Sequence, residues 1–173
     1  MQIRMVKMSD VWSLTNFYMS LKENERILFH PFPFRYPLVF LIILYFAFSN
    51  FLYEYLDLIN NKLSVISLVA EHEGSIQGFV FISNIKERKV AKNFGIVVGR
   101  RWRGRGIGRN LADAMIDICK KEGINEIHLT VMAKNKSAIS LYKKLGFEVT
   151  EYHEKRERWG GKFYPDYSMV FWG

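Results

Sequence analysis

The chain has 173 residues, 49% of them hydrophobic and 24% charged, which suits one folded domain and excludes a largely disordered protein. Its net charge of +8 favours an anionic partner: nucleic acid, a membrane surface or a phosphorylated cofactor. Cys119 is the single cysteine, so an intramolecular disulfide is excluded, and its helical spacing predicts packing in the core. The four histidines lack ligand spacing and predict no metal site.

The first ten residues show neither the continuous apolar region nor the cleavage pattern of a signal peptide. Together with the lack of a cysteine pair, this predicts a cytoplasmic protein. No linker, low-complexity tract or internal repeat divides the sequence, so we expect one domain.

Residues 1–60 predict a strand and two helices. Residues 2–8 alternate between apolar and polar side chains, as in a strand. The stretch "SDVWSLTNFYMSLKENERI" predicts a helix capped by Ser9 or Asp10, and one face of it carries Val11, Leu14, Tyr18 and Leu21. The prolines of "HPFPFRYP" end this helix, and a second, apolar helix runs to about Asn60.

Residues 36–48, "YPLVFLIILYFAF", are apolar or aromatic throughout. The stretch is shorter than the roughly 18–20 residues that cross a bilayer, so we expect no membrane span. A helix that packs on one side of a sheet buries only about half of its circumference. The outward half therefore predicts a homodimer with this helix in its interface, while core burial and contact with a membrane surface stay open.

A meander of three strands is predicted next. Residues 63–71 and 76–84 have the character of buried strands, and Gly74 lies in the turn between them. A second turn at "KERK" leads to a third strand over residues 92–98.

The second half of the chain alternates between helices and strands. "GIGRNLADAMIDICKKEG" predicts a helix that stops at Gly123, with an apolar face of Ile107, Leu111, Met115 and Ile118. "INEIHLTVMA" predicts a strand, and "SAISLYKKLGF" predicts a short helix with Gly146 at its C′ position. Two strands around a Gly-Gly loop complete a single α/β domain with a mixed sheet.

Between the third strand and the long helix lies "RRWRGRGIG", residues 100–108. The first N–H groups of a helix have no partner within it, and the helix dipole adds positive charge there. Glycines let an anion approach the backbone, and arginines bind phosphate oxygens. The stretch therefore predicts a pyrophosphate-binding loop. The P-loop pattern GxxxxGK[ST] is absent, and GxGxxG is matched only weakly.

This loop resembles the acetyl-CoA signature [QR]-x-x-G-x-[GA] of the GNAT N-acetyltransferase superfamily, through Arg103, Gly106 and Gly108. A second motif of that family, N-x-x-A-x-x-x-Y-x-x-x-G-F, is similar to the segment that contains Asn135, Ala138, Tyr142, Gly146 and Phe147. The clear resemblance covers residues 91–150, and the first 60 residues match only in their layout.

The resemblance implies a mixed, mostly antiparallel central sheet flanked by helices in one domain over residues 1–173. Residues 1–62 would supply a strand and two helices on the acceptor side, 63–150 the cofactor-binding core, and 151–173 a C-terminal hairpin.

The resemblance also implies acetyl-CoA as cosubstrate and no metal. Backbone groups of Ile96, Val97 and Val98 would bind the pantetheine arm as an added strand, and Asn135 would contact the arm or a phosphate. The pyrophosphate would lie on the loop formed by Arg103, Gly104, Arg105, Gly106, Ile107, Gly108 and Arg109. For Arg100, Arg101 and Arg105, binding of the adenosine 3′-phosphate and a solvated basic face are both open.

For catalysis, the family implies Tyr142 as the acid that protonates the leaving thiolate, with packing under the cofactor arm as the alternative. The backbone N–H of Val97 or Val98 would stabilise the oxyanion. Thr130 and Asn93 occupy positions where family members carry a glutamate base. We therefore expect a water relayed through Asn93, Thr130 or a loop residue such as Asp166.

The acceptor site should lie between the two N-terminal helices and the last hairpin. That region contains aromatic side chains with interspersed polar groups: Phe29, Phe32, Phe34, Trp159, Phe163, Tyr164, Tyr167, Glu25, Asp166 and His30. Such walls suit a cationic amine, although the same residues could form core.

The function implied is N-acetylation of a primary amine, in a small molecule or at a peptide or protein N-terminus, by direct transfer in a ternary complex. A basic nucleic-acid-binding module and a catalytically silent acyl-CoA-binding protein are the alternatives. The sequence contains no recognised nucleic-acid motif, so a nucleic-acid partner is not expected.

Overall fold

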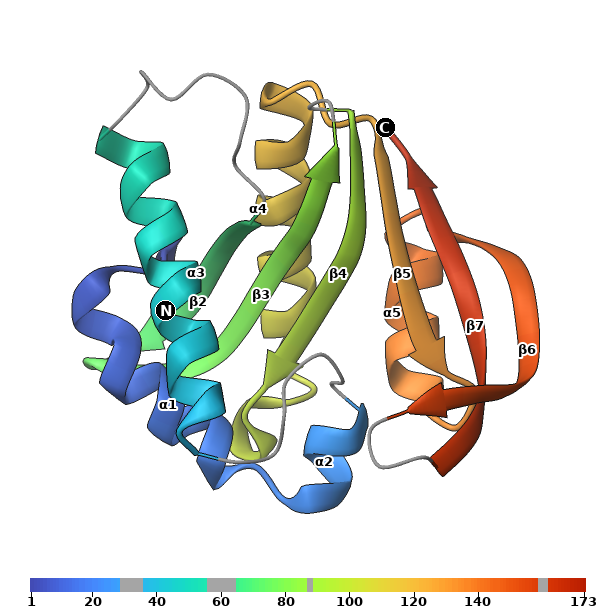
Figure 1. Ribbon diagram of the computed structural model, residues 1–173, viewed down its shortest axis with the longest axis horizontal. Coiled ribbons are helices and arrows are strands. Elements are labelled where there is room, and N and C mark those ends of the chain that lie inside the picture. Colours follow the sequence, from blue (N-terminus) through green and yellow to red (C-terminus); the bar gives the residue numbers. More distant parts are fainter. Residues whose placement is uncertain (29–35, 56–64, 87–88, 159–161) are drawn as a thin grey trace.

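A computed structural model describes residues 1–28, 36–55, 65–86, 89–158 and 162–173. One seven-stranded sheet has the strand order β1-β2-β3-β4-β5-β7-β6, with helices on both of its faces (Figure 1). Neighbouring strands are antiparallel except for the central pair β4–β5, which is parallel. The predicted single α/β domain with a mixed, mostly antiparallel sheet is confirmed.

The strands are β1 Gln2–Met5, β2 Val65–His72, β3 Ser75–Lys86, β4 Val90–Val98, β5 Glu126–Met132, β6 Glu148–Arg158 and β7 Lys162–Trp172. The helices are α1 Val11–Ser20, α2 Glu23–Leu28, α3 Leu38–Tyr55, α4 Ile107–Lys121 and α5 Lys136–Lys144, with the short 3-10 turns η1 Met8–Asp10 and η2 Arg100–Trp102.

These elements follow the predicted order, with two corrections near the N-terminus. The strand predicted over residues 2–8 ends at Met5, and Met8 already belongs to η1. The sequence predicts one helix over 9–27, whereas α1 ends at Ser20 and α2 begins at Glu23. Leu21 adopts an extended conformation and is buried, which turns the chain. The Glu25 carboxylate then accepts a hydrogen bond from the Lys22 N–H at 2.9 Å, and this contact starts a new helix. Residues 29–35 and the predicted helix end near Asn60 lie outside the described residues.

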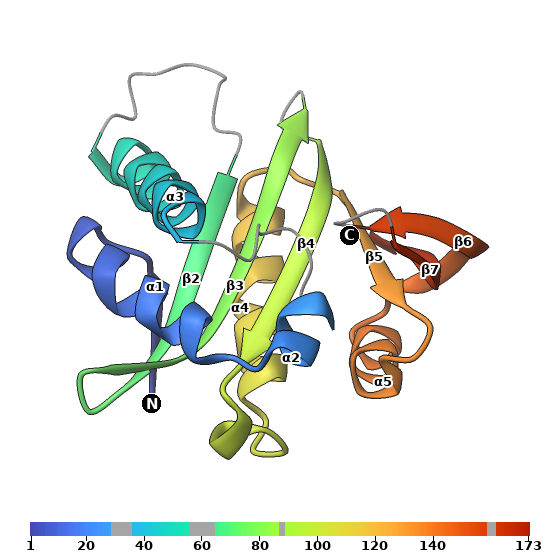
Figure 2. The same cartoon turned by 60° about the horizontal axis from the view of Figure 1, so that its bottom comes forward.

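Two buried clusters pack on opposite faces of the sheet (Figure 2). The α4-side core contains Val80 and Ile82 of β3 together with Leu111 and Met115 of α4. The α3-side core contains the intervening Phe79 and Phe81, together with side chains from α1 and α3. This alternation is the period of a strand buried on both faces. Cys119 is buried in the α4-side core, as predicted.

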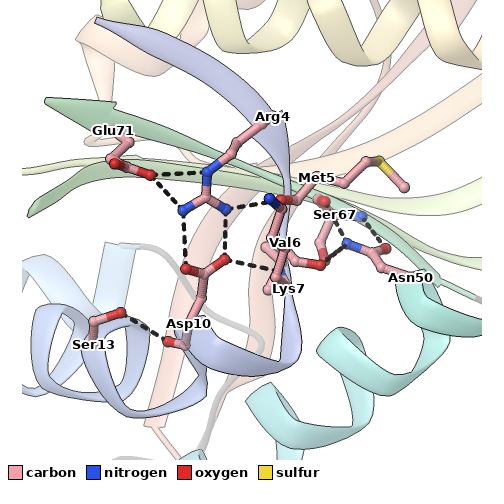
Figure 3. A network of polar contacts seen from close by, with 9 residues as sticks. All are labelled: Arg4, Met5, Val6, Lys7, Asp10, Ser13, Asn50, Ser67 and Glu71. Atoms are coloured by element: carbon pink, nitrogen blue, oxygen red, sulfur yellow. Dashed lines mark hydrogen bonds and ion pairs between the residues drawn. The ribbon is translucent and has the colours of Figure 1, made fainter. Parts of the chain in front are cut away.

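Asn50 joins α3 to the strands beneath it (Figure 3). The side chain is fully buried, and its amide donates to the Ser67 carbonyl at 2.7 Å and the Val6 carbonyl at 3.1 Å. Its oxygen accepts from the Ser67 N–H at 3.1 Å. The amide therefore satisfies backbone groups at the point where β1 ends. The polar pair Ser49-Asn50, which interrupts the apolar sequence, is thus a buried docking point.

Arg4 of β1 lies between Asp10 and Glu71 and is hydrogen-bonded to both (Figure 3). Burial alone would raise the pKa of the Asp10 carboxyl, but the hydrogen bonds from Arg4 and from the Lys7 N–H outweigh it, so the pKa lies below its usual value. The ion pair between Arg4 and Asp10 ties the first strand to the start of α1.

The outward face of α3 is apolar. Val39, Ile43 and Ala47 are buried against the sheet, whereas Tyr36, Leu38, Leu41, Tyr45, Phe48 and Phe51 are 42–54% exposed. Among the helices of the described ranges, none is long and apolar enough to cross a bilayer.

Candidate active site

The parallel strands β4 and β5 separate soon after they meet. Their register consists of two pairs, Val90 with Glu126 and Ala91 with Ile127, and beyond them the strands diverge (Figures 1 and 2). The remainder of β4 stays paired with β3 as far as Val98. The carboxyl-terminal half of β4 is therefore an edge in the middle of the sheet, where backbone groups can accept an added strand.

The register identifies which backbone groups face that edge. The Gly99 N–H donates to the Gln77 carbonyl at 2.8 Å, and hydrogen-bonded pairs alternate in an antiparallel ladder. The backbone groups of Val97 therefore pair with β3, whereas those of Ile96 and Val98 point toward the split. The Val98 carbonyl accepts a hydrogen bond from the Arg103 Nε at 2.9 Å, which agrees with this direction. Of the three predicted strand residues, Ile96 and Val98 have the required orientation.

The glycine loop presents bare backbone to solvent at the start of α4. Gly104 and Gly106 have φ values of +74° and +81°, and a Cβ added to either would meet no atom within 4 Å. Gly106 is the N-cap of α4 and no side chain caps it. The N–H groups of the first turn, including those of Ile107 and Gly108, thus lack intrahelical partners and lie at the positive end of the helix dipole.

The arginines of the loop make different contacts. Arg103 forms an ion pair with Glu25 of α2 at 2.8 Å. Arg105 lies over the ring of Trp102, at 5.1 Å from its centroid. Arg109 pairs along its own helix with Asp113 at 3.3 Å. These exposed side chains surround the helix N-terminus with positive charge, and the residues present fit a pyrophosphate group.

Tyr142 of α5 lies beside the split, between two phenylalanine rings. Its ring centroid is 6.1 Å from that of Phe94 on β4 and 5.6 Å from that of Phe147. The residue is 6% exposed, and burial raises the pKa of its hydroxyl well above the usual value. The hydroxyl is therefore protonated at every ordinary pH and is able to donate.

Asn135 begins α5 as its N-cap. Its side-chain oxygen accepts from the Ala138 N–H at 3.3 Å and from the Ser137 hydroxyl at 3.2 Å. The Asn and the Ala of the motif are thus joined by a helix cap. This cap explains why Ala138 follows Asn135 by three residues. Contact of Asn135 with the cofactor arm remains a prediction.

The two positions that lack a carboxylate base are both exposed. Asn93 donates from its amide to the Ser83 hydroxyl at 3.0 Å, and Thr130 lies on β5. Asn93 lies opposite Ser83 in the β3–β4 register, two residues beyond Ala91, which is the last β4 residue paired with β5.

The prediction that Asp166 lies in a loop is wrong. It is a fully buried residue of β7, opposite Met132 and His153, and it pairs with Arg156 at 3.4 Å. Sequence reasoning also missed Ser168, which lies opposite Thr130 and accepts or donates to the His153 Nε2 at 3.1 Å. The position of Ser168 beside Thr130 follows from the register of β5 and β7 and has no signal in the sequence.

The predicted acceptor wall is partly described. Glu25 lies on α2, and Phe163, Tyr164 and Tyr167 lie on β7. Phe29, His30, Phe32, Phe34 and Trp159 fall outside the described residues. Within the described ranges, no group of three or more His, Cys, Asp and Glu side chains could hold a metal ion.

The fold and this site define an acyltransferase domain. The model of the acetyltransferase (GNAT) family matches residues 23–147, and the chain belongs to this family.

Similar proteins are also acetyltransferases by name. An L-amino acid N-acetyltransferase of Escherichia coli is 34% identical over 64% of this chain and 70% of its own. An uncharacterized N-acetyltransferase of Methanocaldococcus jannaschii is 44% identical over 48% of this chain, and the match spans only 39% of that relative. A Salmonella typhimurium protein solved with its cofactor acetyl-CoA shares the fold, with a TM-score of 0.76 over 99% of this chain and 93% of its own at 19% identity.

Proposed function

We propose that the chain is an acetyl-CoA-dependent N-acetyltransferase that transfers the acetyl group directly to a primary amine in a ternary complex. The observation that carries the proposal is the split between β4 and β5 beside the uncapped, glycine-bounded N-terminus of α4. The split offers strand-like hydrogen bonds, and the helix offers an anion site. Together they match an amide-containing arm joined to a pyrophosphate.

Bound acetyl-CoA would supply the thioester that is cleaved. Backbone groups of Ile96 and Val98 hold its arm, and the first-turn N–H groups of α4 hold its pyrophosphate. The Val98 N–H is also the donor best directed to stabilise negative charge near the split. Tyr142 donates a hydrogen bond or proton at the sulfur. Because burial raises its pKa, Tyr142 is a weaker acid than an ordinary tyrosine, so it donates effectively only once the sulfur carries full negative charge.

Removal of the amine proton needs a base. Asn93 and Thr130, which stand where family members carry a glutamate, do not supply one. Asn93 lies on β4 two residues beyond its last pair with β5, at Ala91, and Thr130 lies on β5 three residues beyond Ile127. Their amide and hydroxyl groups can hold a water between the strands, and this water takes the amine proton to solvent. Asn93 is therefore a candidate catalytic residue through the water that it orients.

The charges on the acceptor side favour an amino acid or peptide amine over a polyamine. The two carboxylates that the sequence assigned to a cation, Glu25 and Asp166, are already paired with Arg103 and Arg156. Arg156 keeps a partly exposed guanidinium, with 35% of its side chain exposed. A guanidinium suits an acceptor that carries a carboxylate or carbonyl close to its amine. The E. coli relative that acts on L-amino acids supports the same class.

We also propose a homodimer through α3. Residues 11–21 and 36–53 contain no charged side chain, so two copies that each carry a charge of +8 can approach there without repulsion. Six half-exposed side chains of roughly 150–250 Å² each offer on the order of 500 Å², and α1 adds the exposed Trp12. A standard interface needs about 800 Å² per partner. Light scattering should give twice the monomer mass at micromolar concentration, and Leu41→Glu should give the monomer. A wild-type monomer would refute the dimer.

Release of coenzyme A thiol tests the function. We expect release from acetyl-CoA with L-amino acids or short peptides and little with spermidine. Burial raises the pKa of the Cys119 thiol to about 12, so the protein adds no background. Binding of acetyl-CoA without release by any amine would identify the silent binder instead. A steep salt dependence of nucleic-acid binding, with no acetyl-CoA binding, would favour the nucleic-acid module.

A further inference from the structure

One carboxylate connects the acceptor side of the molecule with the cofactor loop. Glu25 holds the start of α2 with one oxygen, which accepts from the Lys22 N–H at 2.9 Å. Its other oxygen pairs with the Arg103 Nη1 at 2.8 Å. The Nε of the same arginine donates to the Val98 carbonyl at 2.9 Å. A continuous chain of polar contacts thus runs from α2 through the loop to the open edge of β4.

The pair is built as an internal contact. The Glu25 side chain is 12% exposed and that of Arg103 is 45% exposed. Burial alone would raise the pKa of the Glu25 carboxyl, but the Lys22 N–H and the charges of Arg103 and Arg100 outweigh it and lower the pKa. The carboxylate is therefore charged at neutral pH. The Arg103 guanidinium already has both an anion and a carbonyl as partners within the protein.

We propose that Glu25 and Arg103 form a positioning pair that couples occupancy of the cofactor site to the order of α2. The inference rests on the proposed function. A cofactor along Ile96 and Val98 fixes the edge that Arg103 contacts, and Arg103 in turn fixes Glu25 and the start of α2. Arg103 is then a positioning residue, and the phosphates are held by the α4 N–H groups and by the other arginines of the loop.

Two roles for Arg103 predict different effects of Glu25→Gln. If Arg103 were a phosphate ligand, loss of the carboxylate would release it and tighten acetyl-CoA binding by more than about fivefold. If the two residues form a positioning pair, Glu25→Gln leaves the acetyl-CoA Kd within about fivefold of wild type, because the carboxylate does not contact the cofactor. The variant then loses only the link to α2.

Amide hydrogen exchange on the full chain tests the coupling, with coenzyme A as the probe. In the wild type, coenzyme A should slow exchange in residues 104–109 and also in α2, the latter by at least about fivefold, the lower bound of typical coupling. The variant Glu25→Gln should keep protection of the loop and lose that of α2. Glu23→Gln is the matched control, because it removes an exposed carboxylate from the same helix and should behave as wild type.

The failures are distinguishable. If coenzyme A protects neither segment of the wild type, the proposed function is wrong. If it protects the loop and not α2, or if α2 stays protected in Glu25→Gln, the coupling is wrong. Binding by Glu25→Gln that is more than about fivefold tighter than binding by Glu23→Gln would make Arg103 a phosphate ligand and overturn the positioning role.

Discussion

The rings of Phe94 on β4 and Tyr142 on α5 meet edge to face, with centroids 6.1 Å apart, beyond the last paired residues of β4 and β5. The contact sets the Tyr142 ring against β4, the strand along which the cofactor arm is proposed to lie. Burial of that hydroxyl among aromatic rings is also what raises its pKa.

Tyr142→Phe should separate turnover from binding. The phenyl ring keeps the packing, so the acetyl-CoA Kd should change little, while kcat falls by about 100-fold or more for loss of a general acid. Because the pKa of Tyr142 is raised, the hydroxyl stays protonated up to at least pH 10, so the loss should be constant between pH 6 and 10. Turnover equal to wild type would reduce Tyr142 to packing.

Gly108→Val should remove cofactor binding and leave the fold intact. A Cβ at Gly108 meets Leu141 and Val98 at ordinary contact distances of 3.5 and 3.6 Å, so the protein has room for this first carbon. The two further methyl groups of valine project beside the helix N-terminus and the split, where they hinder the arm and pyrophosphate. We expect the Kd for acetyl-CoA to rise at least tenfold, about 1.4 kcal/mol, in calorimetry. Asp117→Ala, on the exposed side of the same helix, is the control, and unchanged binding in Gly108→Val would refute the loop assignment.

Asp10→Asn should reduce stability in a pH-dependent way. The pKa of the Asp10 carboxyl is lowered in the folded chain, so its contribution is present above the ordinary carboxyl pKa of about 4 and is lost as pH falls further. The variant should lose about 1–3 kcal/mol of unfolding free energy at pH 7, the cost of leaving a partner unpaired. Urea titrations should show the two proteins converging below pH 3, and a constant difference would contradict the assignment.

Asn50→Leu should destabilise the fold without touching the candidate site. The substitution keeps the volume and leaves the Ser67 N–H and the Val6 carbonyl without the Asn50 amide, in a fully buried position, whereas the Ser67 carbonyl keeps its bond from the Val6 N–H. Each unsatisfied buried group costs about 1–3 kcal/mol, so we expect at least about 2 kcal/mol in urea unfolding. Ser49→Ala, which removes a single bond to the Val65 carbonyl, should cost less. A neutral Asn50→Leu would mean that water replaces the amide.

The parts of the fold predicted correctly from sequence are those with local signals. The α4 face of Ile107, Leu111 and Met115 and the helix end at Gly123 follow from spacing and from one left-handed glycine. The glycine loop is also predictable from the sequence, because all of its residues are contiguous.

What sequence reasoning missed depends on contacts between distant segments. Nothing near Glu25 indicates that Arg103 will be its partner, and nothing near Ser168 indicates that the register sets it beside Thr130. The break between α1 and α2 arises because burial of Leu21 outweighs the helical pattern. Asp166 lies within β7 rather than in a loop, because the strand continues through Pro165.

The central claim is direct transfer from acetyl-CoA to an amine, and product stoichiometry measures it. Mass spectrometry of a reaction with acetyl-CoA and an L-amino acid or short peptide should give one acetylated amine for each coenzyme A released. The mass of the protein should stay unchanged after incubation with acetyl-CoA alone, and Gly108→Val should form no product. An acetylated protein that later acetylates the amine, or thiol release without acetylated amine from any acceptor, would contradict the account.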